Sequence, residues 1–457
     1  MEPEREKLQR RAVMDFYAEY REKLRTPEEA VKAVKSGDWV DYTTNLGFPP
    51  LLDAALAKRK DELTDVKIRG NLCFGPIMTA ECDPTREHFV YTSWHFSAYE
   101  RKLSDRGLCS FIPMVFRHVV EYYKHFLTVN VAMMCVTPMD RHGYFNLSCS
   151  TGIAKGILEK ADLVILEVNE KLPHILGGFG ESIHISEVDY VVEGEHGPLP
   201  EVPVQPAEKE DYMIAGQIMP FIPSGATLQL GIGNMPNIIG MQIAESDLED
   251  LGMHTELCSD AYLHLYEAGK LTNRRKTTHR NKGVTGMVFG SRPLYEWVDN
   301  NPGIMAAPLS YVNNPAVIGQ IDNMISINNC IAVDLYGQVS SEGAGGRHIS
   351  GTGGQLDFLT GAAISRGGKS FICLRSSFVN KKGEVISCIR PRFSGDIITD
   401  PRSETYYLVT EYGVINLVGR TTWERAELII SIAHPDFRDE LIRDAERQGI
   451  WRRSNKR

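Results

Sequence analysis

One glutamate and two glycine-rich segments are the features of this sequence best suited to chemistry. Glu256 lies in Gly252–Tyr262 (GMHTELCSDAY), shortly after the first glycine-rich segment, Leu230–Asn237 (LGIGNMPN). The second glycine-rich segment is Ser341–Phe358 (SEGAGGRHISGTGGQLDF). A carboxylate can attack an activated acyl group as a nucleophile, and glycine lets backbone N–H donors approach a ligand closely. These residue types together indicate chemistry at an acyl carbon.

Each of these features, taken alone, also has an ordinary structural explanation. The segment 230–237 follows a strand pattern and precedes a helix pattern, so its N–H groups can face a ligand. A tight strand-to-helix turn would look the same, and the third glycine of the dinucleotide fingerprint is absent. A lone glutamate is usually a solvated surface charge. The segment 341–358 could be a surface loop, but it runs directly into QLDFLTGAAIS. That packed pattern favours a binding loop.

The apolar runs around these segments predict the scaffold that positions them. ADLVILEV (161–168), TLQLGI (227–232) and KSFICL (369–374) are rich in branched apolar residues, which is typical of strands buried on both faces of a parallel sheet. Helical patterns such as PEEAVKAVKSG and TTWERAELIISIAH accompany them. We therefore expect an α/β fold with open, mostly parallel sheets flanked by helices.

The chain also repeats itself once. The runs that begin at Ser36 and Ser224 both open with Ser-Gly and a strand pattern, and both end near Leu-x-Asp. Met139–Ser148 and Val333–Glu342 form a second matching pair, each with Asp, two residues and then Gly. One duplication would give both pairs. We therefore expect two similar domains, residues 1–200 and 201–457, that meet in the Pro- and Glu-rich segment 194–211, with Glu256 in the second.

Composition excludes several classes of protein. The net charge of −9 and the lack of a long basic block argue against nucleic acid as a partner. The nine cysteines are widely spaced without C-x-x-C, which argues against a disulfide framework or a zinc ribbon, and no histidine pattern predicts a metal. No long apolar run predicts a membrane span. The charged N-terminal run is typical of a helix rather than a signal peptide, so we expect a cytoplasmic protein.

The three motifs, in this order and spacing, resemble the acetyl-CoA hydrolase/transferase family. The resemblance covers nearly the whole chain, including SGDWVDY, HGYFN, LGGFGESIHIS, AVDLYGQV, GGKSFICL, LVTEYGVINL, ISIAHPDFRDELI and IWRRSN. It implies a transferase that moves coenzyme A between small carboxylic acids. Coenzyme A would be a substrate and part of a covalent intermediate, with no tightly bound cofactor and no metal.

The resemblance also implies roles for individual residues. Glu256 matches the family's catalytic glutamate, which carries coenzyme A as a glutamyl thioester. The other matched positions would contact coenzyme A or the developing oxyanion: Gly231, Ile232, Gly233, Asn234, Met235, Ile331, Gly353, Gly354 and Lys381. The neighbouring Lys382 leaves the register of Lys381 open by one residue. Four further residues have open roles in substrate binding or packing: His254, Arg347, His348 and Glu411.

The implied substrates are a short-chain acyl-CoA, with butyryl-CoA expected, and acetate as the acceptor, in a homo-oligomer. The stretch TNLGFPP departs from the family pattern, and its Thr43, Thr44 and Asn45 could supply polar groups to an acyl pocket. A 4-hydroxybutyryl group is therefore the alternative substrate. An acyl-CoA hydrolase would use the same residues, and a non-catalytic metabolite sensor is the alternative from another class.

Overall fold

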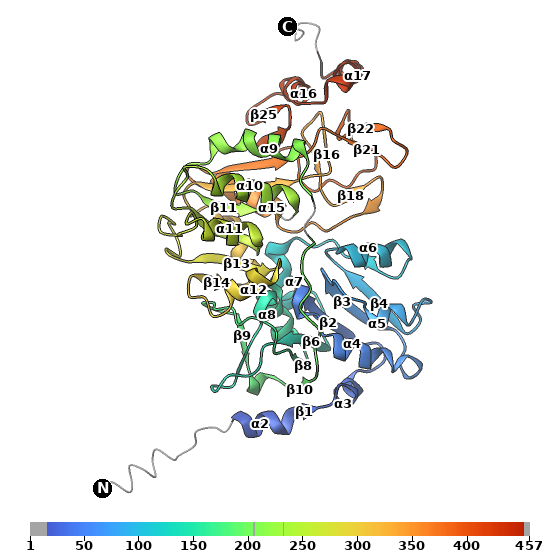
Figure 1. Cartoon of the computed structure of the whole chain (residues 1–457). Helices are drawn as coiled ribbons and strands as arrows, with labels where there is room; N and C mark the ends of the chain where they lie inside the picture. The colour runs from blue at the N-terminus through green and yellow to red at the C-terminus, as the bar shows by residue number, and fades with distance from the viewer. Residues whose placement is uncertain (1–15, 204–205, 232, 452–457) are drawn as a thin grey trace, which may run out of the picture.

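The computed structural model describes residues 16–203, 206–231 and 233–451 (Figure 1). Helix α2 (Phe16–Lys23) forms part of the helix expected from the charged N-terminal run, and the rest of that run lies outside the described residues. All nine cysteines are free thiols. Within the part of the chain that the structure describes, no helix is both long and apolar enough to cross a membrane.

The N-terminal half forms an eight-stranded sheet in which every neighbouring pair of strands is parallel. In spatial order its strands are β1 (Leu24–Arg25), β10 (Tyr190–Glu193), β8 (Leu163–Val168), β6 (Val131–Val136), β2 (Trp39–Thr44), β3 (Val66–Asn71), β4 (Phe89–Ser93) and β5 (Ser110–Phe111). The longer helices of this half are α4 (Pro50–Ala57), α6 (Ala98–Asp105), α7 (Val119–His125) and α8 (Thr151–Lys160). Its central strands are buried, as their apolar sequences predict.

The C-terminal half forms a second eight-stranded sheet, parallel except at its last edge pair. In spatial order its strands are β14 (Ile304–Ala306), β13 (Gly283–Val288), β12 (Gly252–Cys258), β11 (Thr227–Leu230), β15 (Met324–Asn329), β20 (Lys369–Cys373), β24 (Tyr407–Thr410) and β25 (Gly413–Asn416). Its helices include α9 (Lys209–Ile218), α10 (Asn234–Ala244), α11 (Asp260–Glu267), α12 (Arg292–Val298), α15 (Gln355–Ile364), α16 (Thr422–Ser431) and α17 (Pro435–Arg447).

The order of strands is the same in both sheets, which supports the predicted duplication. The edge strand β1 precedes the other strands of its half, whereas the edge strand β25 follows the other strands of its half. Apart from these two, the strands of each half begin at an inner strand, β2 or β11, and the next three are added on one side. The chain then crosses over and adds β6, β8 and β10, or β15, β20 and β24, on the other side. Only the outermost strand differs, because β1 pairs in parallel and β25 in antiparallel. The α/β fold class with two similar domains is confirmed, whereas the boundary near residue 200 stays a prediction.

The matched turns have the same geometry in both halves. Asp65 and Asp250, which end the first pair of repeats, adopt φ angles of 57° and 56°. In the second pair, Asp140 Oδ1 accepts a hydrogen bond of 2.9 Å from the N–H of the residue four positions on, and Asp334 Oδ1 accepts one of 3.0 Å in the same way. Left-handed backbone outside glycine is uncommon, so these coincidences favour one repeated unit.

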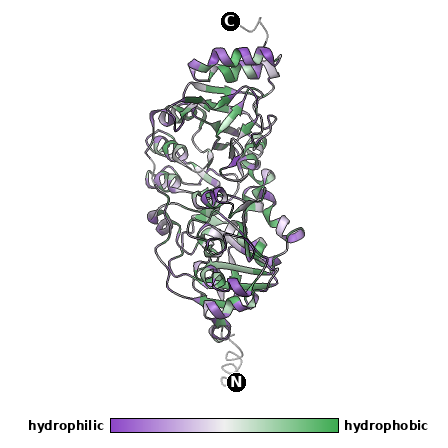
Figure 2. Ribbon diagram, turned by 90° about the vertical axis from the view of Figure 1, so that its right-hand side faces the viewer, coloured by the Kyte–Doolittle hydropathy of each residue, from purple (hydrophilic) through white to green (hydrophobic). Residues whose placement is uncertain are grey.

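The two halves meet through the loops at the carboxyl ends of their strands. Figure 1 shows the N-terminal sheet, coloured blue to green, below the C-terminal sheet, coloured yellow to orange. Figure 2 shows hydrophobic strands inside both halves and hydrophilic helix faces outside. The rings of Phe74 and Phe289 stack across the junction with centroids 3.9 Å apart. Asn45 Nδ2 also donates to the carbonyl of Val288 at 2.8 Å. The carboxyl edge of the sheet that contains Glu256 therefore faces the N-terminal domain.

A buried ion pair stabilises the N-terminal sheet. Arg69 Nε and Nη2 donate to both oxygens of Asp41, at 2.9 and 2.7 Å, and Tyr123 donates to the same carboxylate at 2.7 Å. We expect Arg69→Met to lower the free energy of unfolding by about 3–5 kcal/mol, because it leaves a buried carboxylate without its cation. Urea denaturation measures this. Lys58→Met, which removes an exposed ion pair, should cost about 1 kcal/mol or less. Equal effects of the two substitutions would contradict the prediction.

Candidate active site

Glu256 lies near the carboxyl end of β12 and lines a cavity of about 230 Å³. The adjacent strand β11 lies between β12 and β15, where the strand order reverses direction. Ligands of open α/β sheets bind at this kind of switch point. Residues 229–231 at the end of β11 and residues 350–355 of the second glycine-rich segment form further walls, and Leu72 and His95 come from the N-terminal domain. The cavity therefore lies between the two domains.

The second glycine-rich segment packs directly against the Glu256 carboxylate. A Cβ atom on Gly354 would lie 2.1 Å from Glu256 Oε2 and 1.9 Å from Asn313 Nδ2. No side chain fits at those distances, so only glycine allows the backbone to run here. The preceding residue, Gly353, has a φ of +57°, which glycine adopts at little cost. The family resemblance implied that Gly353 and Gly354 contact coenzyme A or the oxyanion, and the structure places Gly354 against the Glu256 carboxylate.

Three polar side chains connect the Glu256 carboxylate to the N-terminal domain. Asn313 Nδ2 donates to Glu256 Oε2 at 2.7 Å and to Asp357 Oδ2 at 3.3 Å. The Arg117 guanidinium pairs with Asp357, and the Arg117 backbone N–H donates to Asp357 Oδ2 at 3.2 Å. Arg117 therefore compensates a buried carboxylate that would otherwise face Glu256 alone.

Sequence reasoning missed all three of these partners. Asp357 lies inside the second glycine-rich segment, where an acid in the first turn of an apolar helix was the available signal. Asn313 follows a short helix, α13 (Leu309–Val312), and Arg117 lies in a single 3-10 turn, η4 (Phe116–His118). Neither of these two residues belongs to a motif, so nothing in the sequence distinguishes them.

The site raises the pKa of Glu256 to about 8. Burial is the main cause, and the charge of Asp357 adds to it, whereas hydrogen bonds from Asn313 and the Gly354 backbone oppose it. Burial likewise raises the pKa of Asp357 to about 6, against the favourable charge of Arg117. This raised pKa favours the protonated form of the Glu256 carboxyl group at neutral pH, whereas only the ionised form can attack an acyl carbon.

The structure brings some of the predicted site residues together around Glu256 and leaves others apart. Gly231, Gly353 and Gly354 line the same cavity. Gly233 is the cap of helix α10 and has a φ of +109°. Asn234 is the first residue of that helix. Ile232 lies outside the described residues.

Three predicted contacts lie away from this cavity. Met235 is buried in the core of the C-terminal domain. The Ile331 N–H donates to the carbonyl of Ser340 at 2.9 Å. Lys381 is exposed in the hairpin of β21 (Ser377–Val379) and β22 (Val385–Ser387). Because coenzyme A is much longer than the cavity, these residues stay predicted contacts of its distant parts.

The residues with open roles have structural partners. The buried ring of His254 bonds to the carbonyl of Val312 at 2.8 Å, and Arg347 Nε donates to Asp105 at 2.7 Å. Glu411 accepts the N–H of Ser376 at 3.0 Å. His348 lies against the ring of Phe111 with centroids 3.5 Å apart.

The TNLGFPP stretch does not reach the Glu256 cavity. Asn45 lines a separate cavity of about 360 Å³ together with Phe48, Phe74 and His196. Its side-chain N–H₂ is already bonded to the neighbouring domain. The stretch therefore serves the contact between the domains, which is an arrangement that sequence patterns could not indicate.

One group of metal-ligating residue types is present among the described residues, namely Cys135, Glu167 and His196. The Glu167 carboxylate accepts the N–H groups of Leu51 and Leu52, at 3.1 and 2.9 Å, where helix α4 begins. His196 Nε2 bonds to the same carboxylate at 2.8 Å. Glu167 thus caps a helix and anchors the interdomain segment.

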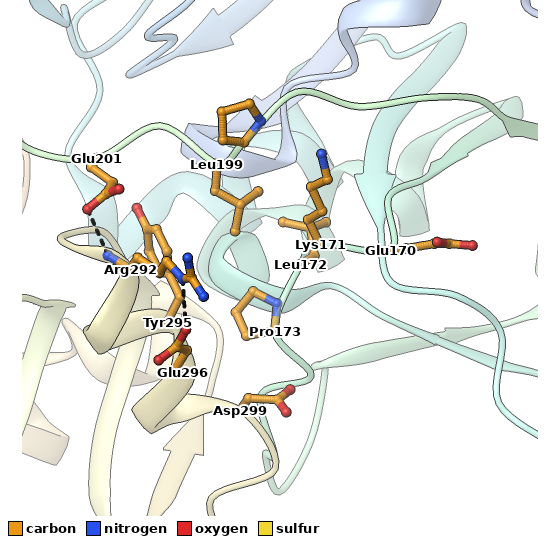
Figure 3. Close-up of a pocket in the computed structure, with 11 residues that line it drawn as sticks. Glu170, Lys171, Leu172, Pro173, Leu199, Glu201, Arg292, Tyr295, Glu296 and Asp299 are labelled. Atoms are coloured by element: carbon orange, nitrogen blue, oxygen red, sulfur yellow. Dashed lines mark hydrogen bonds and ion pairs between the residues drawn. The ribbon is translucent and has the colours of Figure 1, made fainter.

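A larger cavity, of about 630 Å³, lies between residues 170–173, the interdomain segment and helix α12 (Figure 3). Arg292 pairs with two of its carboxylates. Arg292 Nε donates to Glu296 at 2.8 Å, and the Arg292 N–H donates to Glu201 at 2.9 Å. The smaller cavity combines a carboxyl group of raised pKa with both glycine-rich segments, so it is the better candidate site.

Comparison with known proteins identifies the family of the chain. The chain matches the acetyl-CoA hydrolase/transferase N-terminal domain over residues 6–203 and the C-terminal domain over residues 290–445. It is 49% identical to a butyryl-CoA:acetate CoA-transferase of Anaerostipes caccae over 97% of this chain and 100% of that protein. It is 48% identical to a probable butyrate:acetyl-CoA coenzyme A-transferase of Syntrophomonas wolfei, over 96% of this chain and 98% of that protein.

A solved structure agrees with these relatives. RipA from Yersinia pestis superposes with a TM-score of 0.88 at 37% identity, covering 96% of this chain and 100% of RipA. The chain therefore belongs to the acetyl-CoA hydrolase/transferase family.

Proposed function

We propose that this protein transfers coenzyme A from a short-chain acyl-CoA, with butyryl-CoA preferred, to acetate through a glutamyl thioester on Glu256. The observation that carries the proposal is the Glu256 carboxylate, enclosed by Gly354 and Asn313 at the switch point of the sheet. The names of the most similar relatives support the substrates. Leu72, Leu257 and Met287 give the cavity an apolar wall suited to a short alkyl chain.

The reaction follows from the chemistry of a carboxylate beside a thioester. Glu256 attacks the acyl carbon and expels the coenzyme A thiolate, which leaves a mixed anhydride. The thiolate then attacks the Glu256 carbonyl carbon, releases the free acid and forms the glutamyl thioester. Acetate repeats these steps in reverse. Each tetrahedral stage carries an oxyanion, and the backbone N–H groups of the two glycine-rich segments are the donors available for it.

Transfer is favoured over hydrolysis because the cavity lacks a suitable base for water. His95 is the one histidine among the described residues that line it. Burial lowers the pKa of His95 to about 4, and a base this weak assists water poorly at neutral pH. Acetate, the acceptor that attacks the glutamyl thioester, is already ionised at neutral pH and needs no base.

A coenzyme A exchange assay tests the proposal. Butyryl-CoA should be consumed only when acetate is present, with acetyl-CoA and butyrate as the products, and propionyl-CoA should react comparably. Equal consumption without acetate would make the protein a hydrolase, and no consumption at all would favour a sensor. A preference of more than about tenfold for 4-hydroxybutyryl-CoA, roughly 1.4 kcal/mol in the transition state, would overturn the choice of substrate.

The raised pKa of Glu256 predicts a pH dependence. Below a pH of about 8 the carboxyl group of the free enzyme is protonated and cannot attack, so kcat/KM for butyryl-CoA should rise with pH and level off above that value. Asp357→Asn removes the negative charge that disfavours ionisation, so its midpoint should lie at lower pH. Rate profiles of both enzymes measure this. An unchanged midpoint in a folded Asp357→Asn enzyme would contradict the assignment.

The same proposal includes the remaining expectations. Gly231–Met235, Ile331 and Lys381 would contact coenzyme A, which acts as a substrate rather than a resident cofactor. The chain would work in the cytoplasm as a homo-oligomer, without a metal.

A further inference from the structure

His95 lies where the N-terminal domain borders the Glu256 cavity. It follows β4 by two residues, at the carboxyl edge of the N-terminal sheet, and its side chain is only 9% exposed. Its Nδ1 atom is buried and has no hydrogen-bond partner. A buried polar atom without a hydrogen-bond partner costs folding free energy. A hydrogen bond to a ligand in the cavity would remove this cost.

The imidazole and the Glu256 carboxylate face the same small space. A Cβ atom built on Gly353 would lie 3.7 Å from His95 Nδ1 and 3.9 Å from Glu256 Oε1. The positive φ of Gly353 disfavours any side chain there, so only the Gly353 backbone lies beside both groups. Because both also line the same cavity, a small substrate that enters it borders the ring and the carboxylate.

Three of the four side-chain amides of the cavity are already occupied. Gln229 and Asn328 donate to each other, at 3.0 and 2.9 Å. Gln355 Nε2 donates to Ser341 and to Asp400, at 2.8 and 2.6 Å. The fourth amide, Asn329, comes from the end of β15 in the C-terminal domain. Among the described residues that line the cavity, only His95 has a buried side-chain polar atom without a partner.

A neutral donor suits this position better than a cation would. Burial, aided by the neighbouring His348 and Arg101, lowers the pKa of His95 and so favours the neutral ring. A neutral imidazole carries one N–H donor, and with the proton on Nδ1 that donor is the atom without a protein partner. A lysine or arginine there would pair with the ionised Glu256 and reduce its reactivity as a nucleophile. A neutral N–H can bond a substrate oxygen and leave the carboxylate free.

We propose that His95 binds the reacting acid, its Nδ1–H donating to the acyl oxygen that is a carbonyl oxygen in the thioester and a carboxylate oxygen in the free acid. This inference rests on the proposed function and extends it, because it assigns a second substrate-binding group to the N-terminal domain. The bond would hold the acyl carbon over Glu256 in the donor half-reaction, and would hold the acceptor acid for its attack on the glutamyl thioester.

Two substitutions separate hydrogen bonding from packing. His95→Phe keeps a ring but has no N–H, and His95→Gln keeps an N–H donor. We expect His95→Phe to lower kcat/KM for both butyryl-CoA and acetate by roughly tenfold to a hundredfold, as the loss of one substrate hydrogen bond does. His95→Gln should regain most of this activity. His174→Phe is the matched control, because His174 also has an unpartnered Nδ1 but lies outside the cavity.

A spectroscopic measurement tests binding without turnover. In protein with ¹⁵N-labelled histidine, the His95 ring signal is the one missing from His95→Gln, and it should shift when acetate is added. Full activity of His95→Phe, or no shift with acetate, would overturn the proposal while leaving coenzyme A transfer intact. Failure of His95→Gln to exceed His95→Phe would also overturn it, because packing would then explain the loss. Absence of exchange in the unmodified enzyme would instead refute the proposed function.

Discussion

Glu256→Ala is expected to abolish coenzyme A exchange, with a loss of about 10⁴-fold or more. The substitution removes the atom that forms the covalent intermediate, and no other described carboxylate lines the cavity to replace it. Incubating the unmodified enzyme with butyryl-CoA alone should add the mass of one coenzyme A to the peptide that contains residue 256. The variant should gain none, and borohydride should reduce the adduct because it is a thioester.

Glu245→Ala is the matched control for this loss. Glu245 is an exposed glutamate of the same domain, at the end of helix α10, and it does not line the cavity. Its activity and mass adduct should equal those of the unmodified enzyme. Near-native exchange by a folded Glu256→Ala enzyme would remove the glutamyl intermediate from the mechanism.

Gly354→Ala is expected to lower kcat by roughly a hundredfold or more, the size of effect seen when an oxyanion donor is displaced. The added methyl group would overlap both the Glu256 carboxylate and the Asn313 amide, so one of them must leave its position. The φ of −111° at Gly354 is open to alanine, which makes the cause steric rather than conformational. Steady-state exchange rates and the yield of the coenzyme A adduct measure the effect.

Gly216→Ala serves as the control for adding a methyl group. Gly216 lies within helix α9, where a Cβ meets no neighbouring atom, so alanine should preserve activity and add slightly to stability. Gly233 differs from both, because a Cβ there has room but the φ of +109° excludes it. Full turnover of Gly354→Ala would mean that the second glycine-rich segment moves away from Glu256 during the reaction.

Much of the fold could be predicted because its signals are local. Strand and helix patterns indicated a parallel α/β architecture, and two pairs of repeated segments indicated the duplication. The turn at Asp250 repeats the turn at Asp65 because both sequences place the same residue after the same helix pattern. Local chemistry fixed the backbone there, so the sequence was enough.

The site could be predicted only where its residues belong to motifs. Glu256 and Gly354 lie in motifs, and the structure places them in contact. Three further residues come from outside the motifs and from both domains. His95 lines the cavity, Asn313 donates to Glu256, and Arg117 donates to Asp357. Their roles depend on how the two sheets face each other, and no pattern within a single segment encodes that arrangement. Asn45 shows the opposite error, since a polar residue expected near the acyl pocket serves the domain contact.

The duplication has a consequence for the division of labour between the two halves. Counting the same number of residues forward from the matched aspartates Asp65 and Asp250 leads to Asn71 at the end of β3 and to Glu256 in β12. The N-terminal copy thus holds an amide where the C-terminal copy holds an acid, and an amide cannot be acylated in the same way. In the proposed mechanism, each chain therefore carries one carboxyl group that can be acylated. The N-terminal copy, which has no such group, supplies Leu72 and His95 to the wall of the cavity at Glu256.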